Sequence, residues 1–443
     1  MKQQSPYFYR KLANGAQVIT ETFDTVQSVS IGFFFKSGVL YESPKLLGVS
    51  HFIEHMLFKG TATRSAKDIA REFDRIGGYL NAFTAKDYCC YYARVVKDKL
   101  PLAIEVLSDM VKGSLFDSSE FERERRVILE EIKMYEDSPD EIIHELLGKN
   151  LWRNAPLGRP ILGTNQTVAA MPRDEVMNVY ESHYLSDNLM VCAAGNIDCD
   201  NLVSLLEYNL KDMRSGKFPA KKTKPFPTYQ TAVFLKDIEQ VHIAIGTPGV
   251  AYKNKERYPI TILNAAFGGG MSSRLFQEIR EKRGLAYAVY SYHTSFRDTG
   301  LFSIYAGTSI EHLGRVLELI HTEIQTVARK GLSRIEINET KEQLKGNLLI
   351  ALESTTNRMN RLATGFLYDM PPIGPDDSIH PFMQVTREQV KETAERLLNE
   401  KNMAITIISP NDQAAQILER CPFSPRTCKV ASLGKGIVPK NNA

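Results

Sequence analysis

The pattern His51-x-x-Glu54-His55 combines two imidazoles and a carboxylate at a spacing that suits metal-dependent chemistry. The preceding residues predict the start of a helix, with Ser50 near its N-cap. In a helix the three polar side chains lie within an arc of about 100°. Imidazoles four residues apart can bind one cation, and a carboxylate in the same arc can lie beside a metal-bound water. The opposite side of this helix is apolar and consists of Phe52, Ile53, Met56 and Leu57.

The same pattern also fits an ordinary amphipathic helix that carries two histidines on its solvent face. The chain has only nine histidines among 443 residues, so the motif is expected by chance in roughly one chain per hundred. A metal site therefore requires a further ligand from another part of the chain.

The segment from Glu120 to Asp137 supplies that candidate ligand. With a helical period, Phe121, Ile128, Ile132 and Tyr135 form an apolar stripe. Glu124 and Glu131 lie on the edge of this stripe, whereas Glu130 lies on the opposite side among charged residues. A buried carboxylate is costly unless a cation neutralises it. We therefore predict Glu131 as the third ligand and Glu124 as a carboxylate that orients an imidazole; the alternative is that an internal cation such as Arg94 satisfies both acids.

Two similar halves are expected to carry these elements. The pattern that begins at Val29 recurs 212 residues later at Val241, and each copy continues with a helix, a glycine-containing turn, an alternating strand and two long amphipathic helices. A lysine- and proline-rich stretch separates the copies. We predict a duplicated α+β fold of mainly antiparallel sheets with helices on one face. The predicted parts are a domain at 1–210, a linker at 211–229 and a homologous domain at 230–443.

Composition excludes several other classes of protein. The chain is 43% apolar and 24% charged, as in ordinary globular proteins, and no apolar stretch approaches the length of a membrane span. The net charge of +3 gives no field that would favour nucleic acid or a membrane surface. The six cysteines are expected to be reduced, mostly buried thiols rather than disulfides or metal ligands. Because the N-terminus has no targeting pattern, we expect a cytoplasmic protein.

Taken together, these motifs resemble the pitrilysin-type (inverzincin) zinc metallopeptidases, and most closely mitochondrial processing peptidase and its bacterial single-length relatives. Glu131 follows His55 at the distance seen in that family. The stretches 77–84 and 268–275 also match, as do Arg280 and Tyr287 within 279–287. The resemblance covers most of the chain.

The resemblance implies one zinc ion held by His51, His55 and Glu131, with Glu54 as general base and Glu124 as supporting acid. It implies that an edge strand holds the peptide substrate and that two residues of the second half anchor its backbone; these positions are Asn81, Ala82, Phe83, Arg280 and Tyr287. Without the resemblance, we would interpret Arg280 as a surface ion-pair residue and Tyr287 as a core aromatic residue. The sequence does not separate a catalytic role of Tyr287, in stabilising the oxyanion, from a role in holding substrate.

The implied function is that of a zinc-dependent endopeptidase acting on peptides or unfolded presequence-like segments. The resemblance also implies that the two domains face each other across a cavity and that the chain forms a homodimer or a heterodimer with a related subunit. Asp87, Cys89 and Cys90 depart from the family pattern after Thr84, which bears on substrate preference. The second half has 263–267 in place of the histidine helix and is expected to hold no metal.

Two alternatives remain open. One is a catalytically inactive scaffold or peptide-binding protein of the same fold. The other is the same site loaded with cobalt, manganese or iron, because imidazole and carboxylate ligands suit these ions too.

Overall fold

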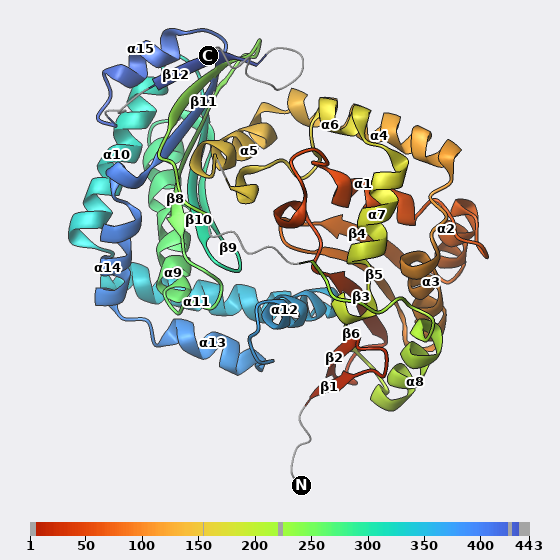
Figure 1. Cartoon of the computed structure of the whole chain (residues 1–443). Coiled ribbons are helices and arrows are strands. Elements are labelled where there is room, and N and C mark those ends of the chain that lie inside the picture. The colour runs from red at the N-terminus through yellow and green to blue at the C-terminus, as the bar shows by residue number, and fades with distance from the viewer. Residues whose placement is uncertain (1–5, 154, 220–224, 424–427, 434–443) are drawn as a thin grey trace. The chain divides into compact units, whose positions relative to one another are not determined.

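The computed structural model describes residues 6–153, 155–219, 225–423 and 428–433. These residues form two compact units, each of which is built around one six-stranded sheet (Figure 1). Unit 1 contains the described residues of Met1–Ile132, Pro160–Lys222 and Leu349–Ile373. Unit 2 contains those of Lys133–Arg159, Thr223–Leu348 and Gly374–Ala443.

The sheet of unit 1 is mixed but mainly antiparallel, with one parallel pairing between β2 and β6. Its strands, in spatial order, are β1 (Tyr7–Lys11), β2 (Gln17–Thr22), β6 (Leu189–Gly195), β3 (Ser28–Phe35), β5 (Cys89–Val96) and β4 (Tyr79–Thr84). The apolar residues of β3 that point to one side, such as Ile31 and Phe33, are fully buried. Strand β4 lies at one edge of the sheet.

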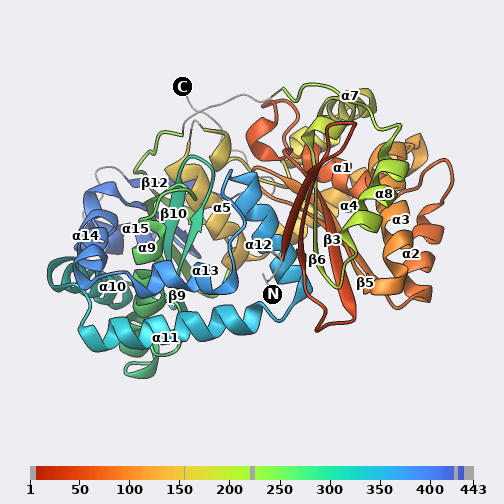
Figure 2. The same ribbon diagram turned by 90° about the horizontal axis from the view of Figure 1, so that it is seen from below.

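Helices cover both faces of this sheet. One face packs against α1 (Val49–Leu57), α2 (Ala66–Arg75), α3 (Leu100–Gly113), α4 (Ser118–Asp137), α6 (Asn165–Ala170), α7 (Arg173–His183) and α8 (Cys199–Leu210). The opposite face packs against α12 (Thr355–Leu367), which comes from the second half of the sequence (Figure 2). The predicted α+β class, with a mainly antiparallel sheet and helices packed on it, is confirmed. Helix α12 is an addition on the second face that the sequence did not predict.

A buried ion-pair cluster holds α12 on the sheet of unit 1. Glu21 of β2 is 1% exposed, and its carboxylate binds Arg358 at 2.5 Å and Arg361 at 3.0 Å, both from α12. The compact units therefore differ from the predicted linear boundaries, because this helix of the second half belongs to unit 1. Helical periodicity shows that one face of a helix is buried but not which sheet it packs against.

The sheet of unit 2 has the strand order β12 (Cys428–Ser432), β7 (Thr231–Leu235), β11 (Ala404–Ser409), β8 (Val241–Gly249), β10 (Gly300–Thr308) and β9 (Ala286–Ser295). One face packs against α9 (Arg257–Phe267), α10 (Leu313–Lys330), α14 (Arg387–Leu397) and α15 (Gln413–Glu419). Helix α5 (Pro139–Leu151), from the first half of the sequence, packs on β8 and β11 from the other face, where Gly246 lies against Leu147. The remaining elements are α11 (Arg334–Ala351), α13 (Pro375–Met383), and the short helices η1 (Val39–Tyr41), η2 (Lys97–Lys99), η3 (Pro156–Gly158), η4 (Ser186–Asn188), η5 (Phe276–Glu281) and η6 (Glu400–Asn402).

The two sheets confirm the predicted duplication. Strands β2, β6, β3, β5 and β4 of unit 1 have the same relative order as β7, β11, β8, β10 and β9 of unit 2. The repeated pattern begins at Val29 in β3 and at Val241 in β8, and both side chains are fully buried. Each unit therefore has one edge strand, β4 or β9, at the equivalent position.

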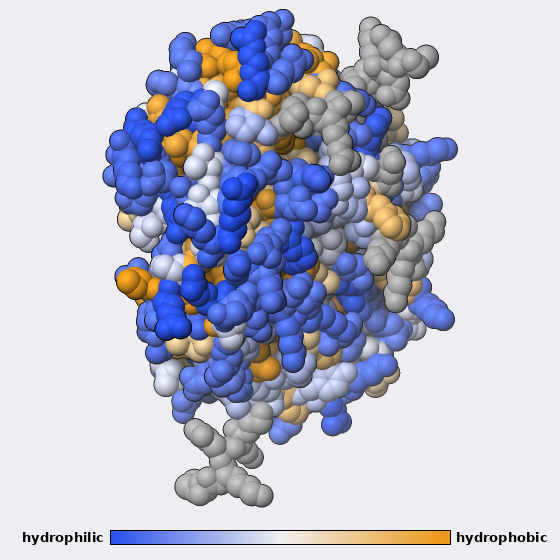
Figure 3. Space-filling view, turned by 90° about the vertical axis from the view of Figure 1, so that its left-hand side faces the viewer, coloured by the Kyte–Doolittle hydropathy of each residue, from blue (hydrophilic) through white to orange (hydrophobic). Residues whose placement is uncertain are grey.

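The molecular surface agrees with the composition. The view in Figure 3 is mostly hydrophilic, with apolar residues in scattered groups. Among the described residues, no helix has both the length and the apolar character that crossing a bilayer would require.

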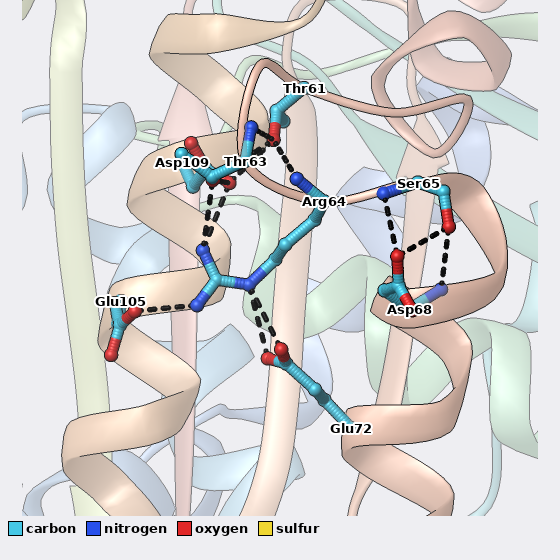
Figure 4. A network of polar contacts seen from close by, with 8 residues as sticks. All are labelled: Thr61, Thr63, Arg64, Ser65, Asp68, Glu72, Glu105 and Asp109. Carbon is cyan, nitrogen blue, oxygen red and sulfur yellow. Dashed lines mark hydrogen bonds and ion pairs between the residues drawn. The ribbon is translucent and has the colours of Figure 1, made fainter.

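A polar network fixes the loop that follows α1 (Figure 4). The guanidinium of Arg64 contacts Glu72 of α2 at 3.1 Å and two residues of α3, Glu105 at 2.5 Å and Asp109 at 3.0 Å. Asp109 also accepts a hydrogen bond from the Thr61 hydroxyl at 2.7 Å. One cation therefore joins this loop to two helices that pack on the sheet.

We expect Arg64→Met to lower the free energy of unfolding by about 1–3 kcal/mol, because three carboxylates then lose their shared cation. The expected loss is modest because Glu105 is exposed, so solvent screens its ion pair with Arg64. Chemical denaturation should show the loss. The control is Arg71→Met on the exposed side of α2, and an equal loss in that variant would contradict a specific role for Arg64.

Candidate metal centre

Three predicted ligands come together in unit 1. His51 and His55 extend from α1, and Glu131 extends from α4. A carboxylate oxygen of Glu131 lies 3.7 Å from Nε2 of His51 and 3.5 Å from Nε2 of His55. Among the described residues, this is the one group of three or more potential metal ligands, with ligand atoms within 4.8 Å of one another.

Packing determines which face of α1 carries the imidazoles. Phe52, Ile53, Met56 and Leu57 are fully buried in the core of unit 1, as predicted. The remaining face of the helix carries His51, Glu54 and His55. The polar arc that the sequence predicts is therefore confirmed.

Helix α1 begins where the sequence predicts. Its N-cap is Gly48, in a left-handed conformation with φ of 90°, and Ser50 lies two residues after this cap. The buried carboxylate of Glu42 accepts hydrogen bonds from the backbone N–H groups of Gly48 and Ser50, both at 2.9 Å. A carboxylate at this end of a helix binds free N–H groups and is favoured by the helix dipole. Glu42 thus fixes the start of the helix two residues before His51.

Glu124 lies behind His55, as predicted. It is 2% exposed, and its carboxylate lies 3.0 Å from Nδ1 of His55. The other carboxylate oxygen lies 2.7 Å from the ammonium group of Lys59. The internal cation is therefore Lys59 rather than Arg94, and it acts together with the imidazole. These contacts hold the pKa of Glu124 below its usual value despite burial.

The two imidazoles have opposite electrostatic environments. Burial and the neighbouring His55 lower the pKa of His51 to about 4, which keeps its ring neutral. Burial also acts to lower the pKa of His55, but contacts with Glu124 and Glu131 outweigh it and raise that pKa to about 9. The contact with His55 lowers the pKa of Glu131. The site therefore attracts a positive charge, which a proton or a metal ion can supply.

The donor set fits zinc. Ligand atoms around tetrahedral zinc lie ~3.3 Å apart, given bond lengths of 2.0–2.1 Å, and the distances to Glu131 are 3.5 and 3.7 Å. Two imidazoles and one carboxylate are the three-ligand set of catalytic zinc sites, which keep a fourth position for water. The Glu124–His55 contact is the outer carboxylate that usually orients such an imidazole.

Glu54 lies between the metal ligands and the edge strand. Burial raises the pKa of its carboxyl group. The hydroxyl of Thr84, the last residue of β4, donates a hydrogen bond to it at 2.5 Å. The predicted general base is thus connected directly to the strand that is predicted to hold substrate.

Three further predicted residues, Asn81, Ala82 and Phe83, lie in β4 at the edge of the sheet. Strand β4 pairs with β5 on its inner side. On the other side, the backbone N–H of Ala82 donates to the side-chain carbonyl of Asn81 at 2.8 Å. An added peptide strand would take over this kind of backbone hydrogen bond.

Arg280 and Tyr287 belong to unit 2, in η5 and at the start of the edge strand β9. The guanidinium carbon of Arg280 lies 4.7 Å from the ring centre of Tyr287 and 4.8 Å from that of Phe276. Tyr287 is 79% exposed, so it is not a core aromatic residue. Their predicted contact with substrate stays a prediction.

Sequence reasoning did not identify Glu42, Lys59 or Thr84 as parts of the site. Lys59 is four positions after His55 but lies just beyond the end of α1, so the helical period would have placed it on the same side only if the helix were taken to continue. Glu42 lies outside any regular helix, and its contact arises from the fold of the chain before α1. Asp87, which departs from the family pattern, is buried and accepts a hydrogen bond from the Tyr368 hydroxyl at 2.7 Å.

Comparisons with known proteins agree with this geometry. The sequence model of the insulinase family (peptidase family M16) matches residues 17–165, and that of the peptidase M16 inactive domain matches residues 170–344. The uncharacterized zinc protease YmxG of Bacillus subtilis is 40% identical over 90% of this chain and 97% of its own length. An uncharacterized zinc protease of Streptomyces coelicolor is also 40% identical, over 90% of this chain and 88% of its own.

Solved structures show the same fold at lower identity. A protease from Helicobacter pylori has a TM-score of 0.85 at 20% identity, covering 91% of this chain and 99% of that one. A peptidase M16 inactive domain structure from Pseudomonas fluorescens has a TM-score of 0.85 at 21% identity, covering 91% and 98%. The length of the match, the identity to named zinc proteases and the two domain assignments all support the same family. The chain therefore belongs to the pitrilysin-type metallopeptidases of the insulinase family, peptidase family M16.

Proposed function

We propose that the protein is a zinc-dependent endopeptidase that carries one zinc ion per chain. The observation that carries the proposal is the convergence of His51, His55 and Glu131 next to the buried carboxylate of Glu54. Bound zinc supplies Lewis-acid activation of a carbonyl group and lowers the pKa of water. The family relationship and the names of the relatives also support the proposal of a zinc-dependent peptidase.

Glu54 has the position of a general base. Its carboxylate would accept the proton of the attacking water and later donate it to the amine that leaves. The hydrogen bond from Thr84 would hold one oxygen of this carboxylate and leave the other for the proton. Glu124 and Lys59 would keep the His55 ring in the orientation that a ligand requires.

Strand β4 is the proposed binding surface for the substrate. An extended peptide can add to an edge strand through backbone hydrogen bonds, with little demand on its sequence. Asn81, Ala82 and Phe83 supply this edge, and Thr84 connects it to Glu54. We therefore propose peptides or unfolded presequence-like segments as substrates. We also propose from the resemblance that the chain acts as a homodimer or with a related subunit.

Metal removal tests this function against a catalytically inactive scaffold. The full chain is dialysed with a chelator, and cleavage of an unstructured peptide is followed by mass spectrometry. We expect cleavage at internal peptide bonds to stop without metal and to return when one equivalent of zinc is added. Cobalt, manganese and iron are added in parallel to identify the metal. Zinc binding without cleavage of any peptide would favour the scaffold.

A second expected result concerns the anchor in unit 2. Tyr287→Phe should slow peptide cleavage about tenfold or more, as loss of one hydrogen bond to substrate or oxyanion does, and leave the zinc content unchanged. The control is Tyr208→Phe, which changes another tyrosine that is 71% exposed. Unchanged cleavage, or loss of zinc, in Tyr287→Phe would show that the residue does not hold substrate.

A further inference from the structure

The guanidinium of Arg280 contacts two aromatic rings of unit 2. Its central carbon lies 4.8 Å from the ring centre of Phe276 and 4.7 Å from that of Tyr287. Both distances are within the ~6 Å at which an aromatic ring attracts a cation. Two rings therefore hold the position of a side chain that is itself only half-buried.

The local backbone brings these three residues together. Phe276 and Arg280 both belong to η5, which is a π-helix, a rare form that is frequent at functional sites. Ile279, between them, is fully buried in the core of unit 2 and fixes this segment. The chain then turns at Gly284, which has a left-handed φ of 62° and donates its N–H to the carbonyl of Arg280 at 2.9 Å. This turn leads into β9 and places Tyr287 beside the guanidinium.

Arg280 has weaker polar contacts than the two cations that follow it. Lys282 and Arg283 both pair with the carboxylate of Glu278, the latter at 2.6 Å. Within the described part of the chain, the guanidinium of Arg280 makes no hydrogen bond, and its one ion pair is a long contact of 3.9 Å from Nε to Glu281. The N–H groups at the edge of this planar group are therefore available to a ligand that accepts hydrogen bonds.

We propose that Phe276 is a positioning residue that acts on peptide substrates through Arg280. Its ring, together with that of Tyr287, fixes the guanidinium so that the N–H edge is ready to bind an oxygen of the peptide backbone. A side chain that is already held in its bound orientation loses less conformational freedom when the ligand arrives, which strengthens binding. The inference rests on the proposed peptidase function and adds a residue that acts without touching the peptide or the metal.

The test measures peptide binding apart from cleavage. The zinc-loaded full chain carries Glu54→Gln to suppress hydrolysis, and a fluorescein-labelled unstructured peptide is titrated by fluorescence anisotropy. Arg280→Met should weaken binding about tenfold or more, as the loss of hydrogen bonds to a charged group does. Phe276→Leu should weaken it about two- to fivefold, as the loss of one exposed cation–π contact does. Phe276→Tyr keeps an aromatic ring and should restore the affinity.

A double-mutant cycle distinguishes this role from a general effect on folding. In the Arg280→Met background, Phe276→Leu should not weaken binding further, because it acts through the guanidinium. Additive losses, or unchanged affinity in Phe276→Leu alone, would overturn the proposal. If Phe276→Leu does not fold by circular dichroism, Phe276→Met takes its place. The control is Arg283→Met, which leaves Lys282 to pair with Glu278 and should not change the affinity.

Failure of this inference is distinguishable from failure of the proposed function. Zinc content should be equal in all variants, and cleavage is measured in the chain that retains Glu54. Cleavage without coupling between Phe276 and Arg280 would remove this inference and leave the peptidase. Coupled binding without cleavage would remove the proposed endopeptidase and leave the role of Phe276. No binding of the peptide would overturn both.

Discussion

Glu54→Gln is expected to lower peptide hydrolysis by at least the roughly 10²–10⁴-fold that general base catalysis contributes. Glutamine keeps the size of the side chain and the helix geometry, but it does not accept the proton of water. Zinc should remain bound, because His51, His55 and Glu131 are unchanged. The measurements are the initial rate of cleavage of an unstructured peptide and the metal content of the same sample.

The environment of Glu54 makes this test specific. Its carboxylate accepts a hydrogen bond from the Thr84 hydroxyl, and a glutamine carbonyl can accept the same bond, so the contact with β4 survives. A large loss of rate would then result from the loss of the general base and not from a displacement of β4. Normal turnover with zinc bound would contradict the assignment of Glu54 as the general base.

The sequence alone predicts much of the metal centre because helical periodicity determines which side chains share one face of α1 and of α4. His51 and His55 share one arc of α1, and the opposite residues, such as Phe52 and Ile53, are fully buried. In α4 the same period separates buried Glu124 from exposed Glu130. Such predictions need only the phase of one helix relative to its apolar stripe.

Contacts between elements that are distant in sequence are harder to predict. The carboxylate of Glu42 binds the start of α1, although nothing in its local pattern marks it as a helix cap. The carboxylate of Glu21 accepts hydrogen bonds from two arginines of α12, which lie more than 330 residues later in the chain. An amphipathic helix can pack on any apolar sheet face of suitable shape, so periodicity did not identify the sheet to which α12 belongs.

The largest difference in zinc content and activity between variants of neighbouring residues is expected in α4. Glu131→Gln should remove most of the zinc and abolish peptide hydrolysis, because a neutral amide is a poor zinc ligand and two imidazoles remain. Glu130→Gln should change the free energy of unfolding by no more than about 0.5 kcal/mol, as surface substitutions do. Zinc content by mass spectrometry and peptide turnover are measured for both variants at matched folded fraction.

The geometry explains why the two adjacent carboxylates differ. One oxygen of Glu131 lies 3.7 and 3.5 Å from the Nε2 atoms of His51 and His55. Glu130 is rotated by about 100° around the helix and is exposed. One metal ion does not reach both sides of α4. If Glu130→Gln loses zinc and Glu131→Gln keeps it, the helix phase that places Glu124 behind His55 is wrong as well, and the proposed centre fails as a whole.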